Sequence, residues 1–136
     1  MAIAYEAATL RSARMDQITT RAGNAALIRF YDSTGTGRPA TGGAVTTQQK
    51  LAELTLGSPF AAGAASGVLT VTNPTSANAL LSGTATWFRI VKADGTTFVL
   101  DGNVGTSGSD INFTSVAFVS GQPVNVTSFI VTEGNP

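Results

Sequence analysis

Seven short runs with the side-chain periodicity of β-strands follow one another from residue 25 to the end of the chain. Each run is bounded by Gly, Pro, Asn, Asp or Ser, which favour turns. The runs are AALIRFYD, KLAELTL, GVLTVTN, TATWFRIVKAD, TTFVLDG, INFTSVAFV and VNVTSFIVTE. Because no helical pattern separates them, they predict an all-β fold of seven or eight strands, a sandwich or a barrel.

The first residues have a different composition. Residues 2–22 are rich in Ala, Arg, Leu, Met, Glu and Gln, and Gly23 stands where a helix could end. The whole chain, at 136 residues, has the length of one ordinary domain. We therefore expect an N-terminal helical or extended arm, residues 1–24, and one β-domain, residues 25–136.

The arm mixes apolar and basic side chains on one face. At 100° per residue, Leu10 and Ile18 share one arc of the helix. Arg14 and Arg21 fall within that arc, and Arg11 falls at its edge. One interpretation is an arm that contacts another subunit, where the arginines bind carboxylates or backbone carbonyls. The alternative is a frayed terminus whose arginine stems cover the edge of its own core.

The clearest hairpin turns at Asp94-Gly95, a pair that suits a two-residue type I′ turn. Such a turn predicts a core hairpin in which Val91 pairs with Phe98, Arg89 with Leu100, and Trp87 with Gly102. The glycine would leave room for the indole of Trp87. Ile90 and Val99 would share the opposite face, so one face is expected in the core and the other under the arm or a partner.

Two loops leave alternatives open. Residues 33–49 have turn residues throughout, so this long loop is either ordered or flexible. Residues 101–110, DGNVGTSGSD, resemble a calcium loop in Asp101 and Asn103 but lack its glycine at the sixth place and its glutamate at the twelfth. We expect a turn-rich connection there, with a weak cation held by Asp101 and Asp110 as the alternative.

Several classes of function lack their residues. The sequence contains no histidine and no cysteine, which removes the usual general base, the common nucleophile systems and nearly every zinc site. We expect no enzyme, and no catalytic, cofactor-binding or metal-binding residues. Bases are not clustered beyond the arm, and no apolar run approaches the ~20 residues of a membrane helix. A soluble chain made in the cytoplasm, without nucleic-acid or membrane partners, is expected.

The low charge and its distribution bear on assembly. Charged residues form 12% of the chain, about half of the ~25% of an average soluble protein. This is typical of β-proteins packed against neighbours, and equally of a monomer with a threonine-rich solvated face. Residues 1–50 hold six bases and three acids, so they carry plus three and the remainder minus three. Such unevenness favours contact with an acidic surface or head-to-tail pairing.

Three stretches resemble a family of small proteins encoded among the head genes of tailed bacteriophages: RPATGGAVTTQQKLAEL (38–54), GTATWFRIVKADGTTFVLDGNVGTSGSDINF (83–113) and VNVTSFIVTEG (124–134). The resemblance implies a jelly-roll β-sandwich on the capsid exterior of the virion, made in the host bacterial cytoplasm. It implies that the chain decorates or cements the shell by binding the major capsid protein, with self-association as a dimer or trimer. The arm lies largely outside the resemblance.

An alternative function is a glycan-binding or adhesive module displayed on a head or tail, because jelly rolls also serve as lectins. Its aromatic platform would be Trp87, Tyr31 or Phe88. Trp87 opposite Gly102 is more simply explained as a core residue.

Overall fold

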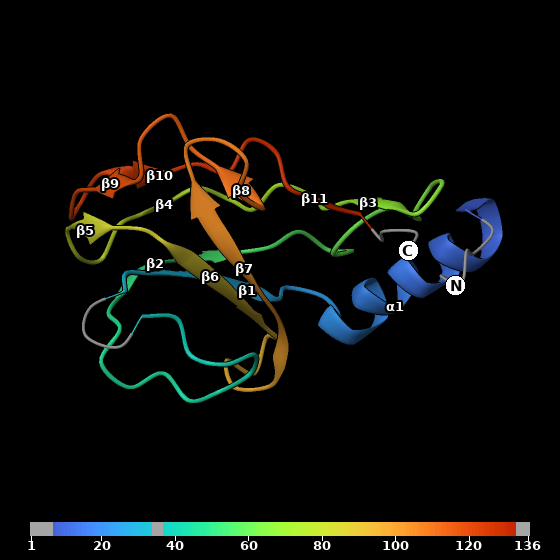
Figure 1. The fold of residues 1–136 in the computed structure, drawn as a ribbon, viewed down its shortest axis with the longest axis horizontal. Helices are drawn as coiled ribbons and strands as arrows, with labels where there is room; N and C mark the ends of the chain where they lie inside the picture. The colour runs from blue at the N-terminus through green and yellow to red at the C-terminus, as the bar shows by residue number, and fades with distance from the viewer. Residues whose placement is uncertain (1–6, 34–36, 133–136) are drawn as a thin grey trace, which may run out of the picture.

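The computed structural model describes residues 7–33 and 37–132 and shows a β-sandwich with a helix at one end (Figure 1). This confirms the predicted all-β sandwich with an N-terminal helix. Five strands form the largest sheet in the order β2-β1-β6-β7-β8. They are β2 (Lys50–Thr55), β1 (Leu27–Tyr31), β6 (Trp87–Val91), β7 (Phe98–Gly105) and β8 (Ile111–Asn112). All neighbours are antiparallel except the short β7–β8 pair.

Short strand pairs complete the sandwich. They are β10 with β4, β11 with β3, and β5 with β9. Their bounds are β3 (Val68–Thr70), β4 (Ala77–Asn78), β5 (Gly83–Thr84), β9 (Ala117–Phe118), β10 (Pro123–Val124) and β11 (Ile130–Thr132). The run INFTSVAFV thus splits into β8 and β9, while β4 lies outside every predicted run. Two-residue strands carry too few residues to show a period in the sequence.

The helix forms where it was expected. A π-helical turn, η1 (Ala7–Arg11), leads into the α-helix α1 (Ser12–Ala22). Gly23 ends the helix with a φ of +67°, a left-handed value that glycine adopts at little cost, and its N–H donates to the carbonyl of Thr19 at 3.1 Å. Residues 2–6 of the predicted helix lie outside the described part of the chain.

The main core lies between the five-stranded sheet and the short pairs. Ile28 and Phe30 of β1 and Ile90 of β6 are fully buried in it. Phe30 contacts the rings of Phe113 and Phe118 edge to face, with centroids at 5.5 Å and 5.8 Å. Alternate residues of the same strands face the other side of the sheet, as the two-residue period of a strand requires.

The hairpin register differs from the prediction after its first pair. Val91 does pair with Phe98, but the pairing then skips Val99, so that Ile90 faces Leu100. Arg89 consequently faces Asp101, and Trp87 faces Asn103. A one-residue bulge moves every later side chain to the opposite face. The pairs Arg89–Leu100 and Trp87–Gly102 were therefore wrong, and Leu100 packs on the main core away from Trp87.

Gly102 does accommodate an aromatic ring, but it is the ring of Phe88. A Cβ atom added at Gly102 would lie 2.4 Å from Phe88 Cε1 and Cζ. The turn is also longer than predicted, since Lys92 N–H donates to the carbonyl of Thr97 and residues 93–96 lie between them. The carboxylate of Asp94 holds this turn by accepting hydrogen bonds from Thr97.

Candidate functional site

One face of α1 packs on the β-domain. Met15 and Ile18 pack against the main core, and Ser12 and Ala22 are buried. Ser12 Oγ accepts a hydrogen bond from the N–H of Gly67 at 3.1 Å. Asp16 Oδ1 accepts another from the N–H of Ala64 at 2.7 Å. These bonds join the helix to the chain between β2 and β3, on a side of α1 that mixes polar and apolar groups.

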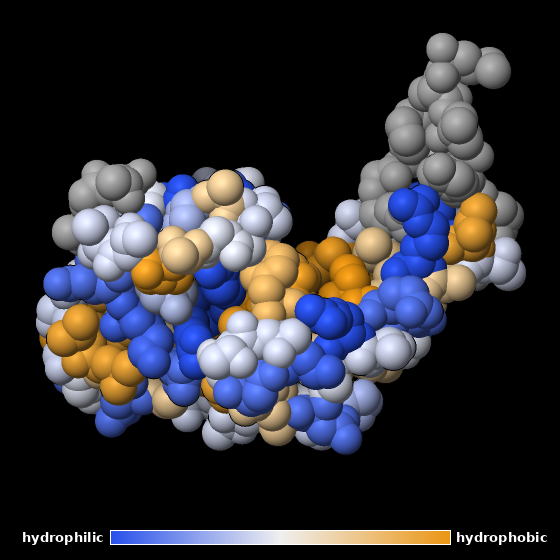
Figure 2. Space-filling view, turned by 90° about the horizontal axis from the view of Figure 1, so that it is seen from below, coloured by the Kyte–Doolittle hydropathy of each residue, from blue (hydrophilic) through white to orange (hydrophobic). Residues whose placement is uncertain are grey.

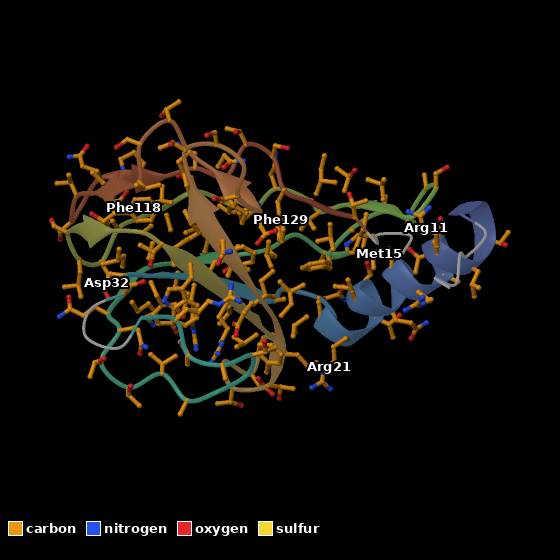
Figure 3. All side chains as sticks on the ribbon, in the orientation of Figure 1. Arg11, Met15, Arg21, Asp32, Phe118 and Phe129 are labelled. Atoms are coloured by element: carbon orange, nitrogen blue, oxygen red, sulfur yellow. The ribbon has the colours of Figure 1, made fainter. Side chains whose placement is uncertain are left out.

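Three of the five candidate arm contacts touch the chain's own β-domain. Arg11 lies over Gly67, where an added Cβ would be 3.0 Å from Arg11 Nε. Ile18 packs on the core, and Arg21 donates from Nε and Nη2 to the carbonyl of Phe98 at 3.3 Å and 3.1 Å. Figure 3 shows Arg11 and Met15 toward β3 and β11, and Arg21 at the opposite edge.

The other two candidate contacts, Leu10 and Arg14, are exposed. Arg11 and Arg21 thus contact the chain's own domain, as in the alternative in which arginine stems cover the edge of the core. Leu10 of η1 and Arg14 of α1 are the candidate contacts that are open to solvent.

Exposed large apolar side chains gather at the two ends of the molecule. The described residues of this kind are Leu10, Leu80, Leu81, Val119 and Ile130, each 44–54% exposed. Leu10 belongs to η1 and Ile130 to β11, at the helix end. The other three lie next to β4, β5 and β9, which Figure 1 places at the opposite end. Figure 2 shows apolar atoms at the end away from α1 and again between α1 and the sandwich.

The apolar patch formed by Leu80, Leu81 and Val119, called here the far-end patch, is held by hydrogen bonds between two connections. Ala79 N–H donates to the carbonyl of Gln122 at 2.8 Å, and Gly121 N–H donates to the carbonyl of Ala79 at 2.9 Å. Ser120 adds bonds to Ser82 Oγ and to the carbonyl of Leu80. Because these bonds hold the backbone of the patch, binding need not order that backbone.

At the helix end, a cleft of about 320 Å³ lies between α1, β7 and β11. Apolar side chains form most of its lining, including Ile18, Leu100, Phe129 and Ile130. The cleft continues the exposed apolar surface of Ile130 toward the helix. The two ends thus differ: one presents a patch on connections, and the other a cleft beside a basic helix.

The opposite face of the large sheet is covered by the chain itself. Residues 37–49 lie over β6 and β7, and the guanidinium of Arg89 is at the centre of the contact. Arg89 binds Asp101 at 2.7 Å and 2.9 Å and donates from Nη1 to the carbonyl of Gly43 at 2.7 Å. The hydrogen bonds from Arg89 to Asp101 raise the pKa of Arg89. The described part of the long loop is therefore ordered.

The three aromatic residues named for the alternative glycan platform are buried. Tyr31 stacks on Trp87 with ring centroids 4.4 Å apart, and Trp87 Nε1 donates to the carbonyl of Asp32 at 2.9 Å. Tyr31, Trp87 and Phe88 are 5%, 1% and 1% exposed. Burial also raises the pKa of Tyr31, although the nearby Arg29 lowers it in part. Tyr31 and Trp87 are therefore buried under the loop of residues 37–49, whereas Phe88 is buried on the opposite, main-core face of the sheet.

The calcium-like loop uses its carboxylates internally. Asp101 binds Arg89, and its side chain is 1% exposed. Asp110 Oδ2 accepts a hydrogen bond from the N–H of Asn103 at 2.8 Å. Among the described residues, no group of three or more Asp, Glu, His or Cys could hold a metal ion. Asp101 and Asp110 thus brace a strand and a turn. The predicted turn-rich connection is shorter than residues 101–110, because residues 101–105 belong to β7.

Sequence reasoning missed the far-end patch. Its signal is the pair Leu80-Leu81 in NALLSG, two large apolar residues between turn residues and outside every strand-like run. Within the described part of the chain, no helix is long and apolar enough to cross a membrane. The chain matches no protein-family model, and no curated protein or solved structure is significantly similar to it.

Proposed function

We propose that the chain is a non-enzymatic virion protein that binds the outside of a tailed-phage capsid and cements neighbouring subunits of the major capsid protein. The observation that carries the proposal is the placement of the exposed large apolar side chains at two opposite ends of the sandwich. The three stretches that resemble phage head proteins supply the partner.

A protein that joins two shell subunits needs two separate contact surfaces. The far-end patch is one, and the exposed surface of the helix end, with Leu10 of η1, Arg14 of α1 and Ile130 of β11, is the other. Once one end is bound, the second contact is effectively intramolecular, so that modest contacts suffice. Complete burial of a leucine or valine side chain contributes about 1.5–3 kcal/mol. Each of the three half-exposed side chains of the far-end patch can contribute part of this free energy when a partner buries it.

Cementing follows from mass action. A chain that binds the assembled shell more tightly than it binds free subunits stabilises the shell against dissociation. The stabilisation equals the difference between the two binding free energies. Self-association as a dimer or trimer would place the same pair of contacts around a symmetry axis of the shell. The low charge suits such a packing surface, because little charge is desolvated on docking.

The first test is the copy number of this chain in purified virions, measured by quantitative mass spectrometry against the major capsid protein. A number comparable with the shell protein supports cementing. A handful of copies per particle contradicts cementing and points to a tail or vertex, and absence from the particle removes the structural proposal altogether.

The second test separates the two ends. Leu80→Ser with Val119→Ser alters the far-end patch, Leu10→Ser alters the helix end, and Ser107→Ala on the exposed β7–β8 loop is the control. The affinity for emptied capsids, measured by co-sedimentation, should fall at least tenfold for both end variants and should not change for the control. Undiminished binding of both end variants, with unchanged melting temperatures, would remove the two-ended account. Point substitutions are preferred to deletion of residues 1–22, because α1 itself contributes the buried Ala22 to the core.

A further inference from the structure

Two adjoining hollows lie on the surface formed by β8, β9, β10 and their connections. Their volumes are about 370 Å³ and 390 Å³, at the small end of the ~300–1,000 Å³ range of ligand sites. Both are lined by Phe113, Thr114 and Asn125, so they form one groove with two compartments. We call it the β8–β10 groove. It is separate from both apolar ends except at Val119, which borders one compartment.

The groove is lined without a single charged side chain. Its polar lining consists of hydroxyl and amide groups, from Thr106, Asn112, Thr114, Ser115, Gln122, Asn125 and Thr127. Thr114 and Asn125, which belong to both compartments, are exposed, so a ligand can reach their donors and acceptors. A lining of this kind offers no positive charge to a phosphate or a carboxylate, but it matches a ligand that both donates and accepts neutral hydrogen bonds.

The apolar part of the lining is an aromatic ring held in place. Phe113 is partly exposed, and its ring packs edge to face on Phe30 and on Phe118 with centroids at 5.5 Å and 5.4 Å. The N–H of Phe113 donates to the carbonyl of Gly105 at 2.9 Å. Figure 3 shows Phe118, one of the supporting rings, inside the sandwich. The ring is therefore held in place by two buried rings while it remains partly exposed at the groove.

The backbone beside the ring is also braced. Asn112 Oδ1 accepts a hydrogen bond from Ser109 N–H, and Asn112 Nδ2 donates to the carbonyl of Ser109, both at 3.1 Å. This reciprocal pair closes the turn that leads into β8. A site whose ring and backbone are both fixed before binding avoids much of the entropy loss of ordering them.

We propose that the β8–β10 groove binds a neutral oligosaccharide. Sugar hydroxyls donate and accept hydrogen bonds as the amide of Asn125 and the hydroxyl of Thr114 require, and the C–H face of a sugar ring packs on the negative face of an aromatic ring such as Phe113. The two compartments fit adjacent sugar units, with the residues shared by both at the linkage. The site lies apart from the helix end, and it meets the far-end patch only at Val119, which borders one compartment.

The test is saturation-transfer difference NMR on the full chain with maltotriose, lactose and mannotriose at millimolar concentrations, and with sialyllactose as a charged probe. We expect transfer to at least one neutral probe. The same probe should shift the amide resonances of Thr114 and Asn125 in a labelled sample. Asn125→Ala and Thr114→Arg should each weaken binding at least fivefold, since one removes the shared amide and the other fills the groove.

Both substitutions lie at exposed positions and should leave the melting temperature unchanged, so loss of binding is not loss of fold. Gln17→Ala, an exposed amide on α1, is the matched control and should bind like the parent chain. The proposal is overturned if no neutral probe binds, if only sialyllactose binds, or if binding survives Asn125→Ala with Thr114→Arg. Because the experiment uses the isolated chain, its failure leaves the capsid proposal untouched.

Discussion

Arg89 and Asp101 face each other across β6 and β7, with Arg89 Nε 2.7 Å from Asp101 Oδ1 and Arg89 Nη2 2.9 Å from Asp101 Oδ2. The two side chains are 9% and 1% exposed. The same guanidinium lies over the rings of Trp87 and Phe98 at 5.4 Å and 5.3 Å. This pair therefore joins the sheet to the loop of residues 37–49, which closes the second face of the sandwich.

Removing one partner of this pair should destabilise the domain strongly. Asp101→Ala leaves the Arg89 guanidinium buried without its carboxylate, which costs about 3–5 kcal/mol in comparable buried pairs. Urea unfolding should report this loss. The control is Glu53→Ala, which breaks the pair of Arg29 and Glu53 at 2.6 Å, where the side chains are 20% and 30% exposed. That loss should be about 0.2–1 kcal/mol. Equal losses in the free energy of unfolding for the two variants would contradict the larger contribution expected of the buried Arg89 pair.

Gly102 should not tolerate even one added methyl group. Gly102→Ala would place Cβ 2.4 Å from two atoms of the buried Phe88 ring, so the ring or the strand must move. Overpacking of this kind costs about 1–3 kcal/mol, measurable as a lower urea midpoint. At Gly63 an added Cβ meets nothing within 4 Å. Gly63→Ala should be neutral or stabilising by up to about 1 kcal/mol, and a similar loss at both sites would contradict the argument.

The turn of the hairpin should make stability depend on acid pH. Hydrogen bonds from the Thr97 hydroxyl, the Thr97 N–H and the Thr96 N–H lower the pKa of Asp94 from its ordinary value of 3.8. A folded pKa below the unfolded value means that the contribution is present above the unfolded pKa and is lost as pH falls toward the folded one. Asp94→Asn should therefore lower the free energy of unfolding at neutral pH. Below about pH 4, the free energy of unfolding of this variant should decrease less steeply with falling pH than that of the parent chain. An unchanged pH profile would show that Asp94 is not stabilised by its turn.

The helix should depend on its polar contact with the β-domain. Asp16→Ala leaves the N–H of Ala64 without its acceptor, a loss of about 1–3 kcal/mol where water cannot replace it. Hydrogen exchange of the amides in α1 should then accelerate about tenfold for each 1.4 kcal/mol by which the substitution lowers the free energy of opening the helix. The amides of β6 and β7 should keep their protection. Gln17→Ala, on the exposed side of the same helix, should change neither. Faster exchange throughout the domain would mean that the helix and the sheet open together.

The candidate sites were only partly visible in the sequence. The helix pattern left open whether Ile18 and the arginines contact a partner or the chain's own core, and the structure places Arg11, Ile18 and Arg21 against the chain's own domain. Helical angles show which residues share a face, but they do not show what packs against it. The far-end patch was missed because Leu80 and Leu81 belong to no periodic run, and only the fold leaves them exposed.

The sequence by itself determined most of the longer strand segments, the end of the helix at Gly23 and the absence of histidine and cysteine chemistry. These properties are local: a two-residue period, a glycine with positive φ, a count of residue types. Only the tertiary structure decided the register of β6 on β7, because a bulge at Val99 and a longer turn depend on packing across the sheet. It likewise decided that Phe88 rather than Trp87 rests on Gly102, and that Arg89 orders the long loop.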